Sequence, residues 1–252
     1  LLLHALGVEE IIPLYCVPDG NFPHNPEPLP ENLSALSAEV KKQKAHLGFA
    51  VDPDVDRLAI VCENGEMFGE EYTLVAVADY VLQNEKGATV SNLSSTRALR
   101  DVTEKHGQKY FASAVGEVNV VKMMKEKNAV IGGEGNGGII YPKLHYGRDA
   151  FVGIALFLSH LARSGKSCTE LRKTYPDYFM SKKKVELSPK INVDKILEGV
   201  KTNYSAYEIN TVDGVKIDFS KSQISGWVHL RKSNTEPIIR IYTESSTQSN
   251  AD

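Results

Sequence analysis

The chain has 252 residues, enough for two or three small domains, and its 42% hydrophobic and 24% charged content is ordinary for a soluble globular protein. The net charge of −3 gives no reason to expect a nucleic acid or a membrane surface as a partner. No stretch is long and apolar enough to span a bilayer. The three cysteines are far apart and lack metal-ligand spacing, which favours a reducing compartment, so we expect a cytoplasmic protein.

The first part of the chain, residues 1–67, alternates predicted helices and strands. Its elements are the tail of a helix, a strand over 11–17, a proline-rich loop over 18–30, a helix over 33–45 and a strand over 47–51. This alternation predicts an α/β layer with a mostly parallel sheet. Because the sequence opens at Leu1 in mid-helix, without an initiator methionine, we expect it to be a fragment of a larger protein.

An acidic loop follows at residues 52–57, where Asp52, Asp54 and Asp56 alternate between two apolar runs. Three carboxylates this close repel one another unless a cation lies among them, and hard oxygen ligands suit Mg²⁺ or Ca²⁺. A calcium-binding EF-hand loop is excluded, because its sixth position needs glycine and is Arg57 here, and because the flanking runs read as strands. We predict a Mg²⁺ site in which the ion and Arg57 neutralise one phosphate; a solvated acidic turn is the alternative.

The second part, residues 68–184, again alternates helices and strands, which predicts a second α/β domain. We expect helices over 71–82, 97–106 and 118–127, strands over 88–93, 110–115 and 129–132, and a helix over 150–163. The last of these is apolar on nearly every face and is therefore predicted to be buried. Arg97 reads as a surface residue of its helix, whereas Glu117, at the end of a strand, is a weaker site candidate.

A glycine-rich loop at residues 132–138 presents Glu134 and Asn136 on an almost bare backbone. Glycines let the backbone approach a ligand closely, and a carboxylate beside an amide suits the neighbouring hydroxyls of a sugar. The loop is not a dinucleotide-binding fingerprint, since a strand rather than a helix follows it. A glycine-rich β-turn without a ligand is the alternative.

The third part, residues 185–252, reads as a small α+β domain, with a helix over 193–201 followed by strands over 207–212, 215–219, 227–231 and 238–243. Asp213 and Gly214 form a strong hairpin turn. Between the last two strands, an arginine loop at residues 231–240 offers a set of hydrogen-bond donors that suits a phosphate: Arg231, Ser233, Asn234, Thr235 and Arg240. A solvated hairpin loop is the alternative.

Together, Asp-x-Asp-x-Asp-Arg at 52–57, the Gly-Glu loop at 133–138 and Arg-x-Ser-Asn-Thr-x-Pro at 231–237 resemble the α-D-phosphohexomutase family: phosphoglucomutase, phosphomannomutase and phosphoglucosamine mutase. The resemblance implies two α/β/α domains, the first truncated, and a small α+β C-terminal domain, here placed at 1–67, 68–184 and 185–252. It implies an isomerase that interconverts hexose 1-phosphate and hexose 6-phosphate. The phosphoryl group would pass through a bisphosphorylated sugar and a phosphoserine in a domain outside this chain, so the fragment alone is expected to be inactive.

The resemblance also implies a role for each motif. Asp52, Asp54 and Asp56 would hold Mg²⁺ against the phosphoserine, and Arg57 would lie beside that phosphate as a catalytic residue. Glu134 would grip the sugar hydroxyls, and the arginine loop would anchor the phosphate that does not react. The expected partners are hexose phosphates and hexose bisphosphates; the oligomeric state is not predicted.

Two departures from the family pattern are visible. The segment from Pro23 to Pro26, Pro-His-Asn-Pro, imitates the phosphoserine loop, but proline replaces the serine. The glycine-rich loop lacks the Ser-Gly-His ending of many members, so the hexose stays open between glucose, mannose and glucosamine. A Mg²⁺-dependent sugar-phosphate phosphatase and a non-catalytic sugar-phosphate-binding module are the alternative functions.

Overall fold

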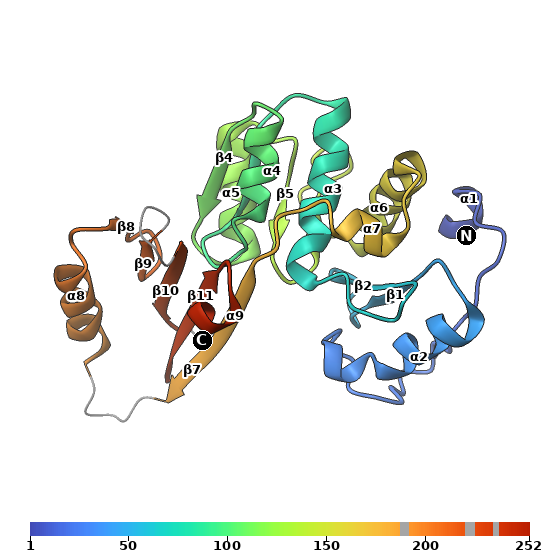
Figure 1. Ribbon diagram of the computed structural model, residues 1–252, viewed down its shortest axis with the longest axis horizontal. Helices are drawn as coiled ribbons and strands as arrows, with labels where there is room; N and C mark the ends of the chain where they lie inside the picture. The colour runs from blue at the N-terminus through green and yellow to red at the C-terminus, as the bar shows by residue number, and fades with distance from the viewer. Residues whose placement is uncertain (187–191, 220–224, 234–236) are drawn as a thin grey trace.

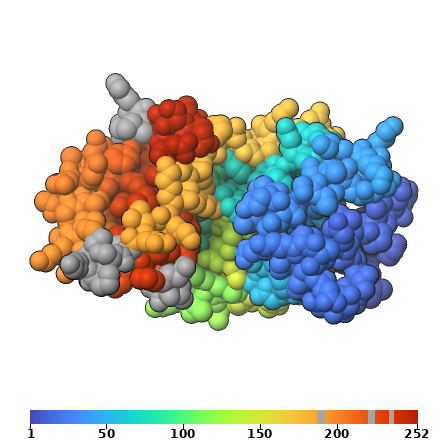
Figure 2. All heavy atoms as spheres, turned by 90° about the horizontal axis from the view of Figure 1, so that it is seen from below, coloured from blue at the N-terminus to red at the C-terminus, as the bar shows by residue number. Residues whose placement is uncertain are grey.

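The computed structural model describes residues 1–186, 192–219, 225–233 and 237–252. Three groups of elements follow one another along the long axis, with the N-terminal group at one end, a central helix-and-sheet group, and the C-terminal group at the other end (Figure 1). Figure 2 shows the same order in a space-filling view from below. The predicted fold class, α/β followed by a small α+β domain, is confirmed. No helix in the described ranges is both long and apolar enough to cross a membrane.

The N-terminal group is built around a two-stranded hairpin. It contains α1 (Leu2–Ala5), the 3₁₀ helix η1 (Pro30–Asn32), α2 (Ser34–Gln43), β1 (Leu47–Val51) and β2 (Leu58–Cys62). The strands β1 and β2 pair antiparallel, so the predicted mostly parallel sheet is wrong for this group. The predicted strand over 11–17 is also wrong: Ile11 and Ile12 are exposed, and no strand among the described residues pairs with this segment. An unpaired strand would leave its backbone groups unsatisfied.

The central group has a four-stranded sheet in the order β4-β3-β5-β6. Its strands are β3 (Thr89–Asn92), β4 (Tyr110–Ser113), β5 (Ile131–Glu134) and β6 (Gly138–Ile140), and its helices are α3 (Glu70–Asn84), α4 (Ala98–Lys105), α5 (Glu117–Lys127), α6 (Ala150–Ser164) and α7 (Cys168–Arg172). The strands β3, β4 and β5 are parallel, and β6 is antiparallel to β5. Successive residues of a strand point to opposite faces, so Ile139 packs in the larger core with α3 and α4, whereas Ile140 packs with α5.

The helix that is buried on nearly every side is α3, not α6 as the sequence predicted. On α6, Ile154 and Phe157 are buried against the core, where the Phe157 ring meets the Phe68 ring edge-on with 5.0 Å between centroids. Phe151 on the same helix is exposed. An apolar helix can therefore carry hydrophobic side chains on its outer face, and its composition alone overstates its burial.

The C-terminal group is a five-stranded antiparallel sheet in the order β7-β11-β10-β9-β8. Its elements are β7 (Phe179–Glu186), α8 (Val193–Asn203), β8 (Glu208–Asn210), β9 (Val215–Asp218), β10 (Gly226–Lys232), β11 (Ile238–Ser245) and α9 (Gln248–Ala251). The hairpin at Gly214 is confirmed, with a φ of 71° at this glycine. The sequence did not predict β7, because its three consecutive lysines resemble a linker. The domain boundaries at residues 67 and 184 stay predictions.

Buried polar contacts join the central and C-terminal groups. Arg97 is buried, its backbone N–H donates to the Glu244 carboxylate, and its guanidinium stacks on the Tyr178 ring at 4.2 Å. The prediction that Arg97 is a surface residue is therefore wrong. Its partner Glu244 also accepts a hydrogen bond of 2.7 Å from the Trp227 indole. Glu244 lies 147 positions after Arg97, so local sequence patterns cannot reveal the contact between them.

His229 is buried in the same interface, between the Ser94 hydroxyl at 2.9 Å and the Asp213 carbonyl at 2.6 Å. Burial lowers the pKa of His229 from 6.5 to about 4. As the pH falls from 6.5, the unfolded chain takes up this proton before the folded chain does, so the folded state loses stability down to about pH 4.

We therefore expect the free energy of unfolding to fall by up to ~3 kcal/mol more in the wild type than in His229→Gln between pH 6.5 and pH 4, as measured by urea unfolding. Glu71 acts in the opposite direction, because burial raises its pKa to about 7, and the comparison of two proteins that share Glu71 cancels its contribution. Equal pH dependence in the two proteins would contradict the prediction.

Candidate functional site

The acidic loop, residues 52–57, is organised by Asp52, which directly follows β1 and is buried. Its Oδ1 accepts hydrogen bonds from the backbone N–H groups of Asp56 at 3.0 Å and Arg57 at 2.9 Å, and its Oδ2 accepts one from Arg57 Nε at 2.5 Å. Val55 has a φ of 60° and is β-branched, a conformation such residues rarely adopt. The loop is thus held in a costly shape by surrounding contacts, as is common at functional sites.

The three aspartates of this loop fit a hard divalent cation. Asp52, Asp54 and Asp56 each offer a ligand atom, and these atoms lie within 4.8 Å of one another. Within the described residues, Asp56 Oδ1 is buried and has no hydrogen-bond partner, and Arg57 Nε lies 3.8 Å from it, beyond hydrogen-bond distance, so this oxygen has capacity left for a cation. Burial, opposed by Arg148 and assisted by Asp52 and Asp54, raises the pKa of Asp56 to about 6. An all-oxygen set with one orphaned carboxylate oxygen is suited to Mg²⁺.

Arg57 is the last residue of the acidic loop, and its side chain turns back toward the carboxylates of that loop. Its guanidinium is shared between Asp52 and Glu27, whose Oε2 is 3.0 Å from Nη1. Burial raises the pKa of the Asp52 carboxyl, but the hydrogen bonds from Arg57 outweigh this effect, so the pKa of Asp52 is lowered from its usual value. Glu27 comes from the proline-rich loop and was not recognised in the sequence.

The glycine-rich loop, residues 132–138, packs directly on the acidic loop. Gly138 forms a β-bridge with Arg57, and the N–H of Leu58 donates to the Gly137 carbonyl at 3.1 Å. Gly137 has a φ of 85°, and a Cβ atom there would lie 2.4 Å from the Leu58 carbonyl oxygen. Only glycine allows this approach, so the spacing of glycines brings the two predicted motifs together.

Glu134, at the end of β5, is buried and strongly held. Its Oε1 accepts hydrogen bonds from Asn92 Nδ2 at 2.8 Å and from the Gly116 N–H at 3.2 Å, and its Oε2 accepts one from Arg148 Nη1 at 2.9 Å. A carboxylate has about four acceptor positions, so little capacity remains for a ligand. Asn136 accepts from the Gly138 N–H at 3.2 Å, which closes the turn.

Four partners of these motifs were not assigned a site role from the sequence, although Glu117 was a weak candidate: Glu27, Asn92, Glu117 and Arg148. Arg148 contacts both the acidic loop and Glu134, and Glu117 Oε1 accepts its backbone N–H at 2.9 Å. A basic residue just before a helix and close after the glycine-rich loop is a weak signal. Arg148 lies 92 positions from Asp56 and 31 from Glu117, so these contacts cannot be read from local spacing.

The arginine loop, residues 231–240, is described only in part. Arg231 and Arg240 are paired across β10 and β11, and the Ser233 N–H donates to the Ile238 carbonyl at 3.0 Å. The predicted ligands Asn234 and Thr235 lie outside the described residues.

Arg231 is linked to the glycine-rich loop by contacts between the C-terminal group and the central group. Its Nη1 lies 4.0 Å from Asp213 Oδ2, which accepts the Val115 N–H at 2.9 Å, and Gly116, the next residue, donates to Glu134. Among the described residues, Arg231 Nε is buried without a hydrogen-bond partner. The three motifs therefore border one region, and Arg231 has donor capacity left for an anion.

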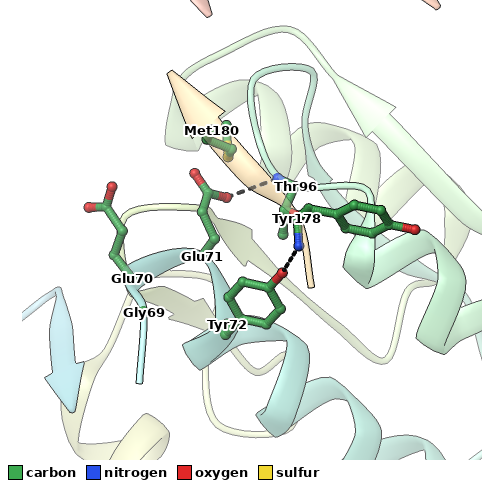
Figure 3. A pocket seen from close by; sticks show the side chains of 7 residues that line it. All are labelled: Gly69, Glu70, Glu71, Tyr72, Thr96, Tyr178 and Met180. Atoms are coloured by element: carbon green, nitrogen blue, oxygen red, sulfur yellow. Dashed lines mark hydrogen bonds between the residues drawn. The ribbon is translucent and has the colours of Figure 1, made fainter. Parts of the chain in front are cut away.

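A hollow of about 140 Å³ lies behind the glycine-rich loop and contains none of the predicted site residues; it is lined by Gly69, Glu70, Glu71, Tyr72, Thr96, Tyr178 and Met180 (Figure 3). Glu71 accepts the Thr96 N–H at 2.9 Å and lies 3.0 Å from Lys182 Nζ. A Cβ atom on Gly135 would overlap the Glu71 carboxylate. The carboxylates of Glu70 and Glu71 are already paired with Lys182, so we assign no ligand to this hollow. Its contribution is structural, because Glu71 packs against Gly135 of the glycine-rich loop.

Three family profiles match consecutive parts of the chain. Residues 1–65 match the phosphoglucomutase/phosphomannomutase alpha/beta/alpha domain II, residues 69–178 match alpha/beta/alpha domain III of that family, and residues 180–252 match its C-terminal domain.

Named relatives agree with these matches. The chain is 38% identical to a phosphoglucomutase/phosphomannomutase of Thermococcus kodakarensis, over 99% of this chain and 54% of that protein. It is 34% identical to a probable phosphoglucosamine mutase of Methanopyrus kandleri, over 100% of this chain and 55% of that protein. A solved structure of a phosphoglucomutase/phosphomannomutase family protein from Burkholderia thailandensis superposes with a TM-score of 0.79 at 27% identity, over 92% of this chain and 50% of that one. The chain thus spans about half the length of the curated relatives that it matches.

Proposed function

The chain belongs to the phosphoglucomutase/phosphomannomutase family, and we propose that the whole protein is a phosphohexomutase that interconverts hexose 1-phosphate and hexose 6-phosphate. The observation that carries the proposal is the convergence of three motifs from distant parts of the sequence. The acidic loop bonds to the glycine-rich loop through Leu58 and Gly137, and Glu134 is connected through the turn at Val115 and Gly116 to Arg231. No observation on the described residues favours a phosphatase or a non-catalytic binding module.

In this proposal Asp52, Asp54 and Asp56 hold Mg²⁺, which when bound supplies positive charge to a transferring phosphoryl group. Arg57 donates hydrogen bonds to the same phosphoryl oxygens. Because its guanidinium is fixed by carboxylates on two sides, it requires little reorganisation when charge develops. The phosphoryl donor and acceptor is a phosphoserine in a part of the protein outside this chain.

The rest of the site holds the sugar and the second phosphate. Glu134 uses its remaining acceptor capacity on a sugar hydroxyl, and Arg231, Ser233, Asn234, Thr235 and Arg240 anchor the phosphate that does not react. The bisphosphorylated sugar must present each of its phosphates in turn to Arg57. Anchoring by many small donors and two guanidinium groups is compatible with both orientations, because no single contact fixes the sugar ring.

We expect Arg231→Ala to weaken the binding of glucose 1,6-bisphosphate to the whole protein with Mg²⁺ by about 10- to 100-fold in isothermal titration. Hydrogen bonds to a charged group contribute about 1.5–3 kcal/mol, which converts to this range. Arg163→Ala is the matched control, since Arg163 lies at the far end of α6 and bonds to Asn84. Unchanged affinity in Arg231→Ala, or no binding by the wild type, would contradict the proposal.

A further inference from the structure

Arg148 joins the acidic loop to the glycine-rich loop. One terminal nitrogen of its guanidinium donates to Asp56 Oδ2, and the other donates to Glu134 Oε2 at 2.9 Å. Its Nε lies 3.6 Å from Glu117 Oε2. A single cation thus faces three carboxylates from three different elements, and its side chain is mostly buried.

The surrounding residues fix the path of this side chain. Glu117 Oε1 accepts the backbone N–H of Arg148 at 2.9 Å, and Asp149 caps α6 by accepting the N–H groups of Phe151 and Val152. A Cβ atom on Gly138 would lie 2.5 Å from Arg148 Cδ, so the glycine leaves room for the arginine stem. Both ends of Arg148 are therefore positioned by rigid elements, in contrast to a flexible surface arginine.

The contact determines how Asp56 is presented. Arg148 occupies Oδ2, whereas Oδ1 is buried, lies 3.8 Å from Arg57 Nε and lacks a hydrogen-bond partner in the described part of the chain. Asp56 is one of the three carboxylates that cluster in the acidic loop. A carboxylate that ligates a metal is usually oriented by a hydrogen bond to its other oxygen, and removing such a partner weakens metal binding by 10- to 100-fold.

We propose that Arg148 is a positioning residue for the cation site: it turns Asp56 Oδ1 toward the ion and ties this carboxylate to Glu134. The inference rests on the proposed function only in taking the acidic loop as a divalent-cation site. It predicts that the cation and the sugar-binding loop are held in a fixed relation by one guanidinium, whichever hexose is bound.

Two effects of removing Arg148 have opposite signs, which makes the inference testable. Removal of a positive charge next to the site would tighten cation binding if only charge mattered. Loss of the orientation of Asp56 would weaken it. Lysine keeps the charge, but its single ammonium lacks the planar fork that reaches two carboxylates at once.

The test is the titration of the whole protein with Mn²⁺ in the absence of sugar phosphate, with free Mn²⁺ followed by electron paramagnetic resonance. We expect the dissociation constant to rise at least about 10-fold in Arg148→Gln and several-fold in Arg148→Lys, and to be unchanged in the control Arg163→Gln. Equal or tighter binding in Arg148→Gln would overturn the inference, as would the absence of Mn²⁺ binding by the wild type. Circular dichroism checks folding, and if Arg148→Gln does not fold, an unchanged constant in Arg148→Lys overturns it.

A second readout separates positioning from a general structural defect. At ordinary Mg²⁺ we expect Arg148→Lys to have a lower kcat/KM for hexose 1-phosphate than the wild type. This loss should be recovered when Mg²⁺ is raised about 10-fold, because the defect lies in the affinity for the ion. A loss that excess Mg²⁺ does not recover would count against the inference. If the wild type binds Mn²⁺ but interconverts no hexose phosphate, the proposed function fails while the Mn²⁺ titration still decides the role of Arg148.

Discussion

Asp54→Asn is expected to lower the turnover of hexose 1-phosphate by the whole protein about 1,000-fold. A bound metal supplies several kcal/mol of charge stabilisation to the transition state, and each 1.36 kcal/mol changes the rate tenfold. Asp54 is the most suitable of the three aspartates for this test because it is exposed, whereas Asp52 accepts the hydrogen bonds that shape the acidic loop. Asparagine keeps the size of the side chain and removes the charge.

The control for this change is Asp19→Asn in the proline-rich loop, where Asp19 is exposed and accepts the Asn21 N–H. We expect it to retain wild-type turnover. The rate is measured at saturating sugar phosphate over a series of Mg²⁺ concentrations, with unfolding curves to show that both variants fold. If Asp54→Asn kept more than a tenth of the wild-type rate at ordinary Mg²⁺, the acidic loop would not be the catalytic metal site.

Gly137→Ala is expected to destabilise the protein by about 3 kcal/mol or more and to reduce sugar-phosphate binding. The left-handed backbone costs an alanine about 1–2 kcal/mol, and overpacking adds a further 1–3 kcal/mol. The added Cβ would lie 2.4 Å from the Leu58 carbonyl oxygen. This backbone cannot easily move away, because the Leu58 N–H is bonded to the Gly137 carbonyl.

Gly165→Ala is the matched control for the clash. Gly165 also has a left-handed backbone, with a φ of 64° at the end of α6, but a Cβ atom there would meet nothing within 4 Å. It should cost only the conformational penalty of about 1–2 kcal/mol. The free energies of unfolding are compared by urea denaturation. Equal losses in the two variants would show that the contact between the acidic and glycine-rich loops does not constrain residue 137.

The features that the sequence predicted well are those encoded by neighbouring residues. The hairpin turn at Asp213 and Gly214 is confirmed, and it depends on two adjacent residues. The same is true of the clustering of Asp52, Asp54 and Asp56, whose ligand atoms lie close together. Short-range motifs carry their own geometry, so they can be recognised before the fold is known.

The features that were missed depend on contacts between distant residues. The pair of Arg148 and Asp56 spans 92 positions and the pair of Arg97 and Glu244 spans 147, so no local pattern reveals either. The strand β7 was missed for a related reason, because its consecutive lysines show no apolar alternation and only its pairing with β11 makes it a strand. Residues that orient a site are found where elements meet, which requires the fold.

The most direct test of the proposed function is the fate of phosphate in a reaction of the whole protein. Glucose 1-phosphate, mannose 1-phosphate and glucosamine 1-phosphate are each incubated with the protein, Mg²⁺ and a trace of glucose 1,6-bisphosphate, and the products are followed by phosphorus nuclear magnetic resonance. We predict that at least one hexose 1-phosphate is converted to its 6-phosphate without release of inorganic phosphate. Release of inorganic phosphate as the main product, or conversion of none of the three, would contradict the assignment as a phosphohexomutase.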